Sequence, residues 1–354
     1  MSLPKYEGRR GSAKTIGLMG VPFAGGQPKG GVDDGPEAIR NGTLVKKLES
    51  YDLFASQLPL TLRWNWAPQD SGWEVADFGD LQFHFDSFCK KDEKSFAKNV
   101  DKVASACHKV SKQVEASVNA YDHTIVLGGD HSGTIGSIHG HAQANSDICV
   151  LWIDAHADLN TPHTSFSGNM HGMPLAFLLH EMEPYLSKQS NPIDWCKPCL
   201  SVKNLAYIGL RDVDPAERYF LDHLGICAFT MEEIDIYGLG PIVKQALDVI
   251  NPNNERRIHV SFDIDALDPV TVAPSTGTPV PGGLTMRDGY FIMETVAKTG
   301  RLAVMDLMEV NPNIGTQQDV QRTVWAANEM ILTGMGKRRS GTLPVHFKPP
   351  ARLD

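Results

Sequence analysis

The sequence lacks the dense cysteine pattern of a small secreted domain held together by disulfides. It has six cysteines in 354 residues, at irregular spacings. Cys196 and Cys199 have the spacing of a thioredoxin-type redox pair. Such a pair stands between a strand and the helix that it opens, whereas here polar residues lead into the apolar run Leu205–Leu210. A structural zinc site would need two further ligands nearby, and they are missing. Neither role is therefore expected of this pair.

Positive charge is also scarce, with 33 Lys and Arg against 42 Asp and Glu and a formal net charge of −9. A nucleic-acid partner would favour a basic surface, so none is expected, whereas a small cationic substrate stays compatible because local charge sets its site. No apolar run approaches transmembrane length and no N-terminal stretch has the apolar core of a signal peptide, so no membrane partner is expected. We expect a cytoplasmic protein. A mitochondrial location is the alternative, because residues 1–14 carry four basic residues.

Short apolar runs rich in β-branched residues alternate with amphipathic stretches. Several runs are almost uninterrupted, which is typical of parallel strands covered on both faces. The predicted strands are Thr15–Met19, Val75–Phe78, Thr124–Leu127, Ile148–Ile153, Leu205–Leu210, Ile226–Thr230, Ile258–Ile264 and Leu302–Met308. The predicted helices include Phe96–Ala120, Pro215–Leu224, Gly240–Ile250 and Met286–Lys298, with starts at Asp214-Pro215 and Thr285.

This alternation predicts an α/β fold: one three-layer domain around a doubly wound, mostly parallel sheet of eight strands. The domain is expected to span residues 1–354, with residues 1–14 as a flexible start and residues 338–354 as a C-terminal tail.

Polar clusters follow four of the predicted strands, at the edge where sites form in parallel sheets. They are Gly128-Gly129-Asp130-His131-Ser132, Asp154-Ala155-His156-Ala157-Asp158, Asp263-Ile264-Asp265 and Glu309-Val310-Asn311-Pro312. Strand residues two apart point to the same face, about 6.6 Å apart. We therefore expect Asp154, His156 and Asp158 to converge while the two alanines turn away, and Asp263 and Asp265 to do the same across Ile264.

Four aspartates and two histidines would then share one cavity. Without cations the aspartates could not all stay ionised, because repulsion and burial raise their pKa values. Two divalent ions would neutralise them, and the mixture of carboxylate and imidazole suits manganese. Two such ions about 3.5–4 Å apart could share a bridging water and lower its pKa towards neutrality.

Each cluster alone has a plainer interpretation. A single Asp-x-Asp or Asp-x-His is usually a solvated turn, and only the coincidence of four clusters at strand ends favours a metal centre. Elsewhere the plain interpretation is preferred. His139 and His141 are expected to be exposed helix residues, and Asp268 is expected to be a turn residue rather than a ligand.

Together, the first three clusters resemble the signatures of the ureohydrolase family, and the likeness runs from Gly20-Val21-Pro22-Phe23 to Glu309-Val310-Asn311-Pro312. The resemblance implies two manganese ions per subunit, bridged by Asp154 and Asp263. One ion would be held by His131, Asp154, Asp158 and Asp263, and the other by Asp154, His156, Asp263 and Asp265.

Within that family, the segment Asn160 to Gly172 resembles the amino-acid-binding loop of animal arginases. The resemblance implies that a substrate α-carboxylate is bound by Asn160, Ser165, Ser167 and Asn169. The stretch Gly209 to Pro215 resembles the segment that accepts the α-ammonium, through Asp214 with the aid of Glu217.

Two departures stand out. Ser165 replaces the threonine common in arginases, which keeps the hydroxyl and loses a methyl contact. The stretch from Asp268 to Thr278 is one residue longer, so Thr278 is assigned to the substrate site without a fixed position.

The function implied by this resemblance is arginase activity, the hydrolysis of L-arginine to L-ornithine and urea by a hydroxide bridging two manganese ions. The resemblance implies that Glu309 receives the guanidinium, that His171 moves a proton and that Asp158 belongs to the catalytic centre. It also implies a homotrimer and a role in arginine metabolism, such as the urea cycle.

Three alternatives remain. An agmatinase or guanidinobutyrase is disfavoured because agmatine has no α-carboxylate for the donor-rich loop. A deacetylase-like amidohydrolase shares the fold class but is typified by one metal, whereas paired clusters favour two. A silent binding subunit is disfavoured because the ligand and acid–base positions are intact.

Overall fold

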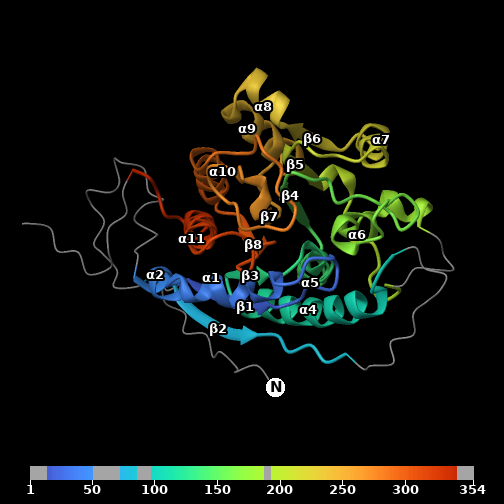
Figure 1. Ribbon diagram of the computed structural model, residues 1–354. Coiled ribbons are helices and arrows are strands. Elements are labelled where there is room, and N and C mark those ends of the chain that lie inside the picture. Colours follow the sequence, from blue (N-terminus) through green and yellow to red (C-terminus); the bar gives the residue numbers. More distant parts are fainter. Residues whose placement is uncertain (1–13, 51–71, 86–96, 187–192, 341–354) are drawn as a thin grey trace, which may run out of the picture.

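The protein is an eight-stranded parallel sheet with helices packed on both faces, as a computed structural model shows (Figure 1). The structure describes residues 14–50, 72–85, 97–186 and 193–340. The predicted flexible start, apart from residue 14, and the predicted tail beyond residue 340 lie outside the described residues. The prediction of an α/β fold around one eight-stranded parallel sheet is confirmed.

The strand order is β2-β1-β3-β8-β7-β4-β5-β6, and all the paired neighbours are parallel. The strands are β1 (Thr15–Val21), β2 (Glu74–Asp80), β3 (His123–Gly128), β4 (Ile148–Ile153), β5 (Leu205–Leu210), β6 (Cys227–Thr230), β7 (Arg257–Asp263) and β8 (Leu302–Met308). The predicted bounds of β4, β5 and β8 are those observed, because apolar runs with at most one charged residue mark strands that are buried on both faces.

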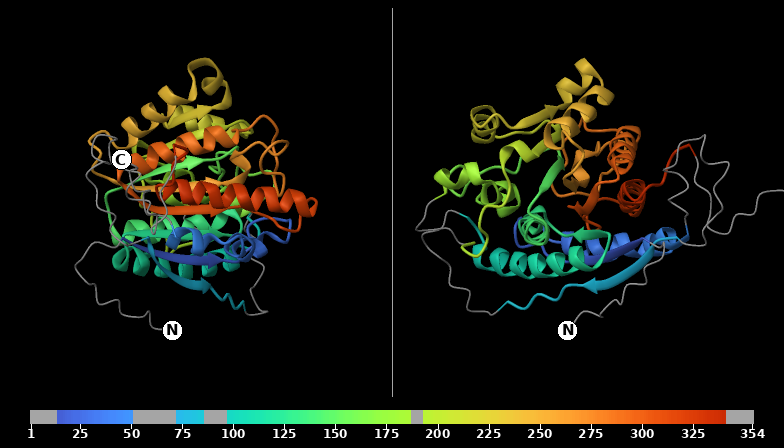
Figure 2. Two further views of the ribbon diagram at one scale, coloured as in Figure 1. Left: turned by 90° about the vertical axis from the view of Figure 1, so that its left-hand side faces the viewer. Right: turned by 180° about the vertical axis from the view of Figure 1, so that it is seen from behind.

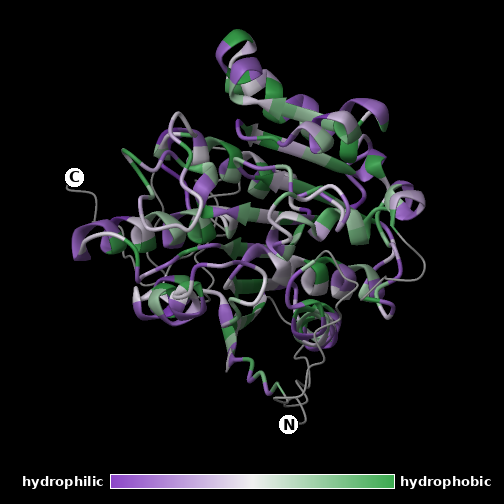
Figure 3. Cartoon of the chain, turned by 45° about the vertical axis from the view of Figure 1, so that its right-hand side comes forward, coloured by the Kyte–Doolittle hydropathy of each residue, from purple (hydrophilic) through white to green (hydrophobic). Residues whose placement is uncertain are grey.

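Two hydrophobic cores separate the three layers. One face of the sheet packs on α1 (Gly35–Asn41), α2 (Leu44–Ser50), α8 (Met231–Tyr237), α9 (Leu239–Ile250), α10 (Met286–Thr299) and α11 (Gln317–Gly334). The other packs on α4 (Val100–Ala120), α5 (Thr134–Ala144), α6 (Pro174–Leu178) and α7 (Pro215–His223). The turned views show α4 and α11 on opposite sides of the sheet (Figure 2). Hydrophobic residues concentrate on the strands, while most surrounding helices carry hydrophilic stripes (Figure 3). None of the described helices is both long and apolar enough to cross a membrane.

The predicted helix starts are confirmed where a capping residue marks them. Asp214 caps α7 and Thr285 caps α10, each in a reciprocal arrangement with an acidic residue three positions on. Helix α4 begins at Val100, later than predicted, because Asn99 takes a left-handed conformation (φ 54°) at its start.

The prediction that His139 and His141 are exposed is wrong. Both lie on α5 and are buried, at 7% and 0% exposure. A Cβ atom on Gly136 or Gly140 would lie 2.3 or 2.4 Å from a backbone oxygen of α4, so the two glycines let α4 pack directly on α5. Helix α5 is therefore enclosed on all sides and shows no exposed stripe.

The Cys196–Cys199 segment has no feature of a redox site. Both thiols are free, and burial raises the pKa of Cys199 to about 12 and that of Cys196 well above its ordinary value. A reactive thiol needs the opposite shift. The segment leads through a short 3-10 turn, η6 (Val202–Asn204), into β5, as the sequence indicated.

Candidate metal centre

The predicted metal ligands and Glu309 come from the carboxyl ends of four adjacent strands, β3, β8, β7 and β4. His131 opens the short 3-10 turn η3 (His131–Gly133) after β3, Asp154 follows β4, and Asp263 ends β7. Glu309 follows β8. Since neighbouring strands lie about 4.8 Å apart, these four ends meet within one cavity.

The acidic clusters do converge, but not by strand alternation as predicted. Strand β4 ends at Ile153, and Asp158 reaches the site through a left-handed backbone (φ 49°). Strand β7 ends at Asp263, and Asp265 lies in the 3-10 turn η7 (Ile264–Ala266), one turn beyond the predicted strand. The Asp263 carboxylate accepts the Asp265 amide, at 2.8 Å, and so forms that turn. The two alanines beside His156 are buried in the core.

Two groups of possible metal ligands share Asp154. In each group the ligand atoms lie within 4.8 Å of one another: His131, Asp154 and Asp263 form the first, and Asp154, His156 and Asp265 the second. Asp158 joins the first group through its Oδ2 atom, 3.1 Å from His131 Nδ1. Asp263, predicted to bridge both ions, lies in the first group only.

The surroundings of His131 suit a cation. Its Nδ1 atom is 3.0–3.1 Å from carboxylate oxygens of Asp154, Asp158 and Asp263, yet it is buried and makes no hydrogen bond. Its Nε2 atom is 2.9 Å from Ser261 Oγ. An imidazole that donates its Nε2 proton to Ser261 presents a lone pair at Nδ1, which faces three acceptors. A divalent ion satisfies all four atoms, whereas one proton satisfies a single pair.

The pKa values of the carboxylates also show that these groups favour positive charge beside them. Burial, with repulsion from Asp154, raises the pKa of Asp158 to about 6. Burial, together with Asp265 and Asp154, raises the pKa of Asp263 well above its ordinary value. Asp154 differs: burial opposes its ionisation, but the adjacent His131 and His156 outweigh burial and lower its pKa. Cations would remove the repulsion that these shifts reflect.

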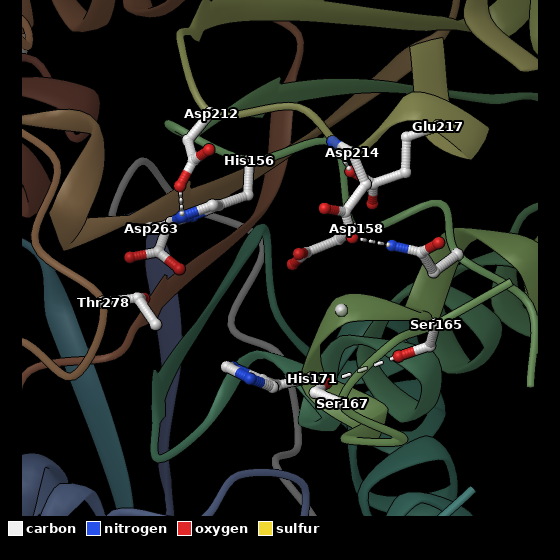
Figure 4. Close-up of a pocket in the computed structure, with 12 residues that line it drawn as sticks. His156, Asp158, Ser165, Ser167, His171, Asp212, Asp214, Glu217, Asp263 and Thr278 are labelled. Atoms are coloured by element: carbon white, nitrogen blue, oxygen red, sulfur yellow. Dashed lines mark hydrogen bonds and ion pairs between the residues drawn. The ribbon is translucent and has the colours of Figure 1, made fainter. Parts of the chain in front are cut away.

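A pocket of about 140 Å³ opens beside these groups (Figure 4). Asp158 and Asp263 point towards its middle, Ser165 and Ser167 lie on one side, and Thr278 lies opposite. Ten of the predicted residues line it: His156, Asp158, Asn160, Ser165, Ser167, His171, Asp214, Glu217, Asp263 and Thr278. His131, Asp154 and Asp265 are buried beneath it, and Asn169 is not among the lining residues.

One wall of the pocket, formed by the loops after β4 and β5, carries both hydrogen-bond donors and acceptors. The Asn160 amide donates to Asp214 Oδ2 at 2.8 Å, which places a neutral donor beside an acid. Ser165 accepts the Gly168 amide at 3.0 Å, and its hydroxyl remains at the pocket. Glu217 accepts the backbone amides of Leu159 and Asp214, at 3.0 and 2.9 Å, and so ties α7 to the metal-ligand loop. Burial raises the pKa of Glu217 to about 8.

Thr278 has a defined position in spite of the longer preceding loop. Its hydroxyl donates to Asp265 Oδ2 at 3.0 Å. Asp268 binds the loop together as the predicted turn residue, since it accepts the amides of Thr271, Gly282 and Gly283.

His171 and Glu309 form a pair at the pocket floor, with His171 Nδ1 3.3 Å from Glu309 Oε1. Burial opposes protonation of His171, but the hydrogen bond to Glu309 and the negative charges of Glu309, Asp158 and Asp130 together outweigh it and raise the pKa to about 9. Burial likewise opposes ionisation of Glu309, but the hydrogen bond and charge of His171, together with the His131 amide and the His131 charge, outweigh it and lower the pKa. Glu309 is 1% exposed and lies below the lining residues.

Several contributors were not found in the sequence. Trp152 donates to Asp154 Oδ2 at 2.9 Å, and Ser261 contacts His131. Each precedes a ligand by two strand positions, so its place on the same face was a usable signal. Asp212 lines the pocket as well, in the segment that was assigned to Asp214. Gln27 contacts Glu309 across 282 positions, and no local pattern signals that contact.

Comparisons with known proteins agree with this architecture. The model of the arginase family matches residues 14–336. The chain is 41% identical to arginase-1 of Sus scrofa over 346 residues, which cover 96% of this chain and 98% of that protein. The crystal structure of an arginase from Bacillus subtilis superposes with a TM-score of 0.75 at 31% identity, covering 92% of this chain and 100% of the other. An Entamoeba histolytica arginase in complex with L-ornithine superposes with a TM-score of 0.73 at 26% identity, covering 92% of this chain and 99% of the other.

Proposed function

The chain belongs to the arginase family, and we propose on that basis that it hydrolyses the guanidinium group of L-arginine to L-ornithine and urea. The observation that carries the proposal is that one pocket combines a possible binuclear metal site with a set of hydrogen-bond donors and acids. Two His/Asp groups that share Asp154 lie at its base, and neutral donors stand beside Asp214 on its wall. A binuclear metal site suits the guanidinium end of arginine, and the donor–acid wall suits its amino-acid end.

We propose manganese as the metal at both positions, since carboxylate and imidazole ligands without thiolate suit it. No cysteine belongs to either ligand group in the described part of the chain. When bound, the two ions would polarise water and lower its pKa from ~15.7 towards neutrality, which supplies the nucleophile. The chain's own residues bind and orient the substrate and move its protons.

The amino-acid end of arginine would bind the wall formed by Asn160, Ser165 and Ser167. These side chains offer neutral donors for the α-carboxylate, while Asp214 offers a carboxylate for the α-ammonium. Asn169, on the same loop as Ser165 and Ser167, is assigned to α-carboxylate binding as well. The Glu217 carboxylate keeps the amides of Leu159 and Asp214 fixed, so it positions Asp214 rather than touching the substrate.

The guanidinium end would pair with Glu309. A carboxylate whose pKa is lowered stays ionised at neutral pH and can accept two parallel N–H bonds from a guanidinium. His171, with its pKa raised, holds a proton at the ring next to Glu309. That proton is available to the leaving amine, after which the ring can accept one in return.

We propose further, from family resemblance, a homotrimer that acts in arginine metabolism such as the urea cycle. We place it in the cytoplasm, with the mitochondrion as the alternative. Size-exclusion chromatography with light scattering tests the assembly, and fractionation of the source cells tests the location.

The deciding experiment measures urea release from L-arginine, agmatine and 4-guanidinobutyrate after manganese loading, with metal content determined in parallel. We expect two metals per chain and a far higher kcat/KM for arginine, because only arginine offers both an α-carboxylate and an α-ammonium to the wall. Equal kcat/KM for arginine and agmatine would overturn the choice of substrate. A fully loaded protein without urea release would overturn the hydrolase.

A further inference from the structure

Gln27 is a buried polar residue that touches the acid assigned to the guanidinium. It lies in the loop after β1, is 7% exposed, and its Nε2 atom is 2.5 Å from Glu309 Oε2. We propose that Gln27 is a positioning residue that holds the Glu309 carboxylate in the orientation that binds the guanidinium. The inference rests on the proposed function and adds a residue that none of the preceding assignments includes.

The Glu309 carboxylate is held at both oxygens from the protein side. The backbone amide of His131 donates to Oε1 at 2.9 Å, and Gln27 donates to Oε2. Each carboxylate oxygen has about two acceptor positions. The Gln27 bond leaves one of them on Oε2 for a guanidinium, and the second position on Oε1, which His171 takes at 3.3 Å, becomes free when His171 turns to the leaving amine. Two fixed donors on different oxygens also define the plane of the carboxylate, which a bidentate pair requires.

The backbone of Glu309 makes this support necessary. Glu309 has φ 64°, a left-handed conformation that a residue with a long side chain seldom adopts. Its amide donates to Gly129 O at 2.9 Å, which fixes the main chain but not the side chain. The side chain is therefore fixed by His131, His171 and Gln27, and only Gln27 holds Oε2 among the described residues.

Gln27 also braces the opposite side of the pocket. A Cβ atom on Gly277 would lie 2.8 Å from Gln27 Oε1, so the absence of a side chain there lets the amide pack against the Thr278 loop. The loop that carries Gln27 is anchored through Gly26, whose carbonyl accepts the His171 amide at 3.1 Å and whose amide donates to Asp130 Oδ2 at 2.7 Å. Gln27 thus connects three segments of the site.

The chemistry at this position favours glutamine. An ionised Glu309 can only accept hydrogen bonds, so the amide must present Nε2 to it. A neutral donor orients the carboxylate and leaves its negative charge for the cationic substrate. A lysine at position 27 would neutralise that charge, and a glutamate would repel it.

The test compares Gln27→Ala with Asn99→Gly in the manganese-loaded full chain. Asn99 donates to Gly25 O at 3.0 Å, so its variant disturbs the same loop without touching Glu309, and glycine tolerates the left-handed backbone there. We expect Gln27→Ala to lower kcat/KM for arginine roughly 10- to 100-fold, as for loss of a hydrogen bond to a charged group. Metal content and melting temperature should stay as in the wild type. We expect Asn99→Gly to stay within about twofold of the wild type.

A second measurement separates positioning from a structural role. In the Glu309→Gln background, the Kd of L-arginine from calorimetry should not change further when Gln27→Ala is added, because the interaction that it supports is already lost. An equal loss of arginine affinity on adding Gln27→Ala to the wild type and to Glu309→Gln would overturn this inference but not the proposed function. A kcat/KM of Gln27→Ala within twofold of the wild type would do the same. Absence of urea release by the wild type would instead overturn the proposed function.

Discussion

Replacing Asp158 by asparagine tests the metal centre with little disturbance of the fold. The side chain keeps its size, and asparagine tolerates the left-handed backbone (φ 49°) at least as well as aspartate. The change removes one negative charge 3.1 Å from His131 Nδ1, where two further carboxylates converge. We therefore expect the loss of one metal ion rather than unfolding.

The size of the effect follows from electrostatics. A unit charge about 3 Å from a divalent ion is worth about 11 kcal/mol at an effective dielectric constant of 20. Two effects offset most of this. Burial of the carboxylate is itself unfavourable by several kcal/mol, and the amide oxygen of asparagine remains as a neutral ligand. A net loss of about 2–4 kcal/mol corresponds to roughly a 30- to 700-fold weaker metal affinity.

The assay is metal analysis by mass spectrometry after gel filtration in metal-free buffer, together with urea release over a manganese titration. We expect the variant to retain about one metal per chain where the wild type retains two, and to recover activity as manganese is raised. Asp248→Asn is the control for the loss of one carboxylate, because Asp248 has a 60% exposed side chain on α9 and lies outside both ligand groups. Two tightly held metals and near-normal turnover in Asp158→Asn would refute the reasoning.

Three further predictions concern the wall and the acids. Asp214→Asn should raise KM for arginine about 10- to 100-fold, because it removes a charge-assisted bond to the α-ammonium, and should leave 4-guanidinobutyrate, which lacks that group, unaffected in steady-state assays. Glu217→Gln should cost about 1–3 kcal/mol in urea denaturation at pH 9, where Glu217 is ionised, because one oxygen cannot accept both backbone amides; unchanged stability would contradict the contacts at Glu217. In the metal-free protein, burial and the charge of Asp154 raise the pKa of Asp158 to about 6, whereas the unfolded chain has a value of about 3.9. Asp158 therefore stabilises the fold fully below pH 4, and this contribution is lost as the pH rises through 6. Manganese keeps the group ionised, and the rise in Tm on adding it should therefore grow between pH 5 and 7; a constant or shrinking rise would contradict the shift.

Much of the sheet could be predicted because burial on both faces leaves an unambiguous pattern. The runs that became β4 and β5 carry no charged residue, the run that became β8 is interrupted only by Asp306, and polar residues mark where they end. The grouping of His131, Asp154 and Asp263 followed from that pattern, since parallel strands bring their carboxyl ends to one edge.

The errors arose where the chain leaves regular structure or where a helix has no exposed face. Asp158 and Asp265 reach the site through a left-handed residue and a 3-10 turn, and neither is visible as a period in the sequence. His141 was misplaced because α5 is enclosed by α4 and the sheet. Gln27 was missed because its contact with Glu309 depends on the tertiary fold alone.

The strand ends hold the metal ligands, whereas the loops form the substrate wall. This separation explains how one fold can keep its chemistry and vary its substrate. The ligand groups stand at the ends of three central strands, β3, β7 and β4, where neighbours on both sides fix their positions. The wall that would read the amino-acid end comes from the loops after β4 and β5, and Ser165 lies on the exposed part of that wall. Changes in these loops can therefore alter affinity without displacing a ligand. The serine at position 165 keeps its hydroxyl at the pocket, so its effect should be confined to KM and leave the metal content unchanged.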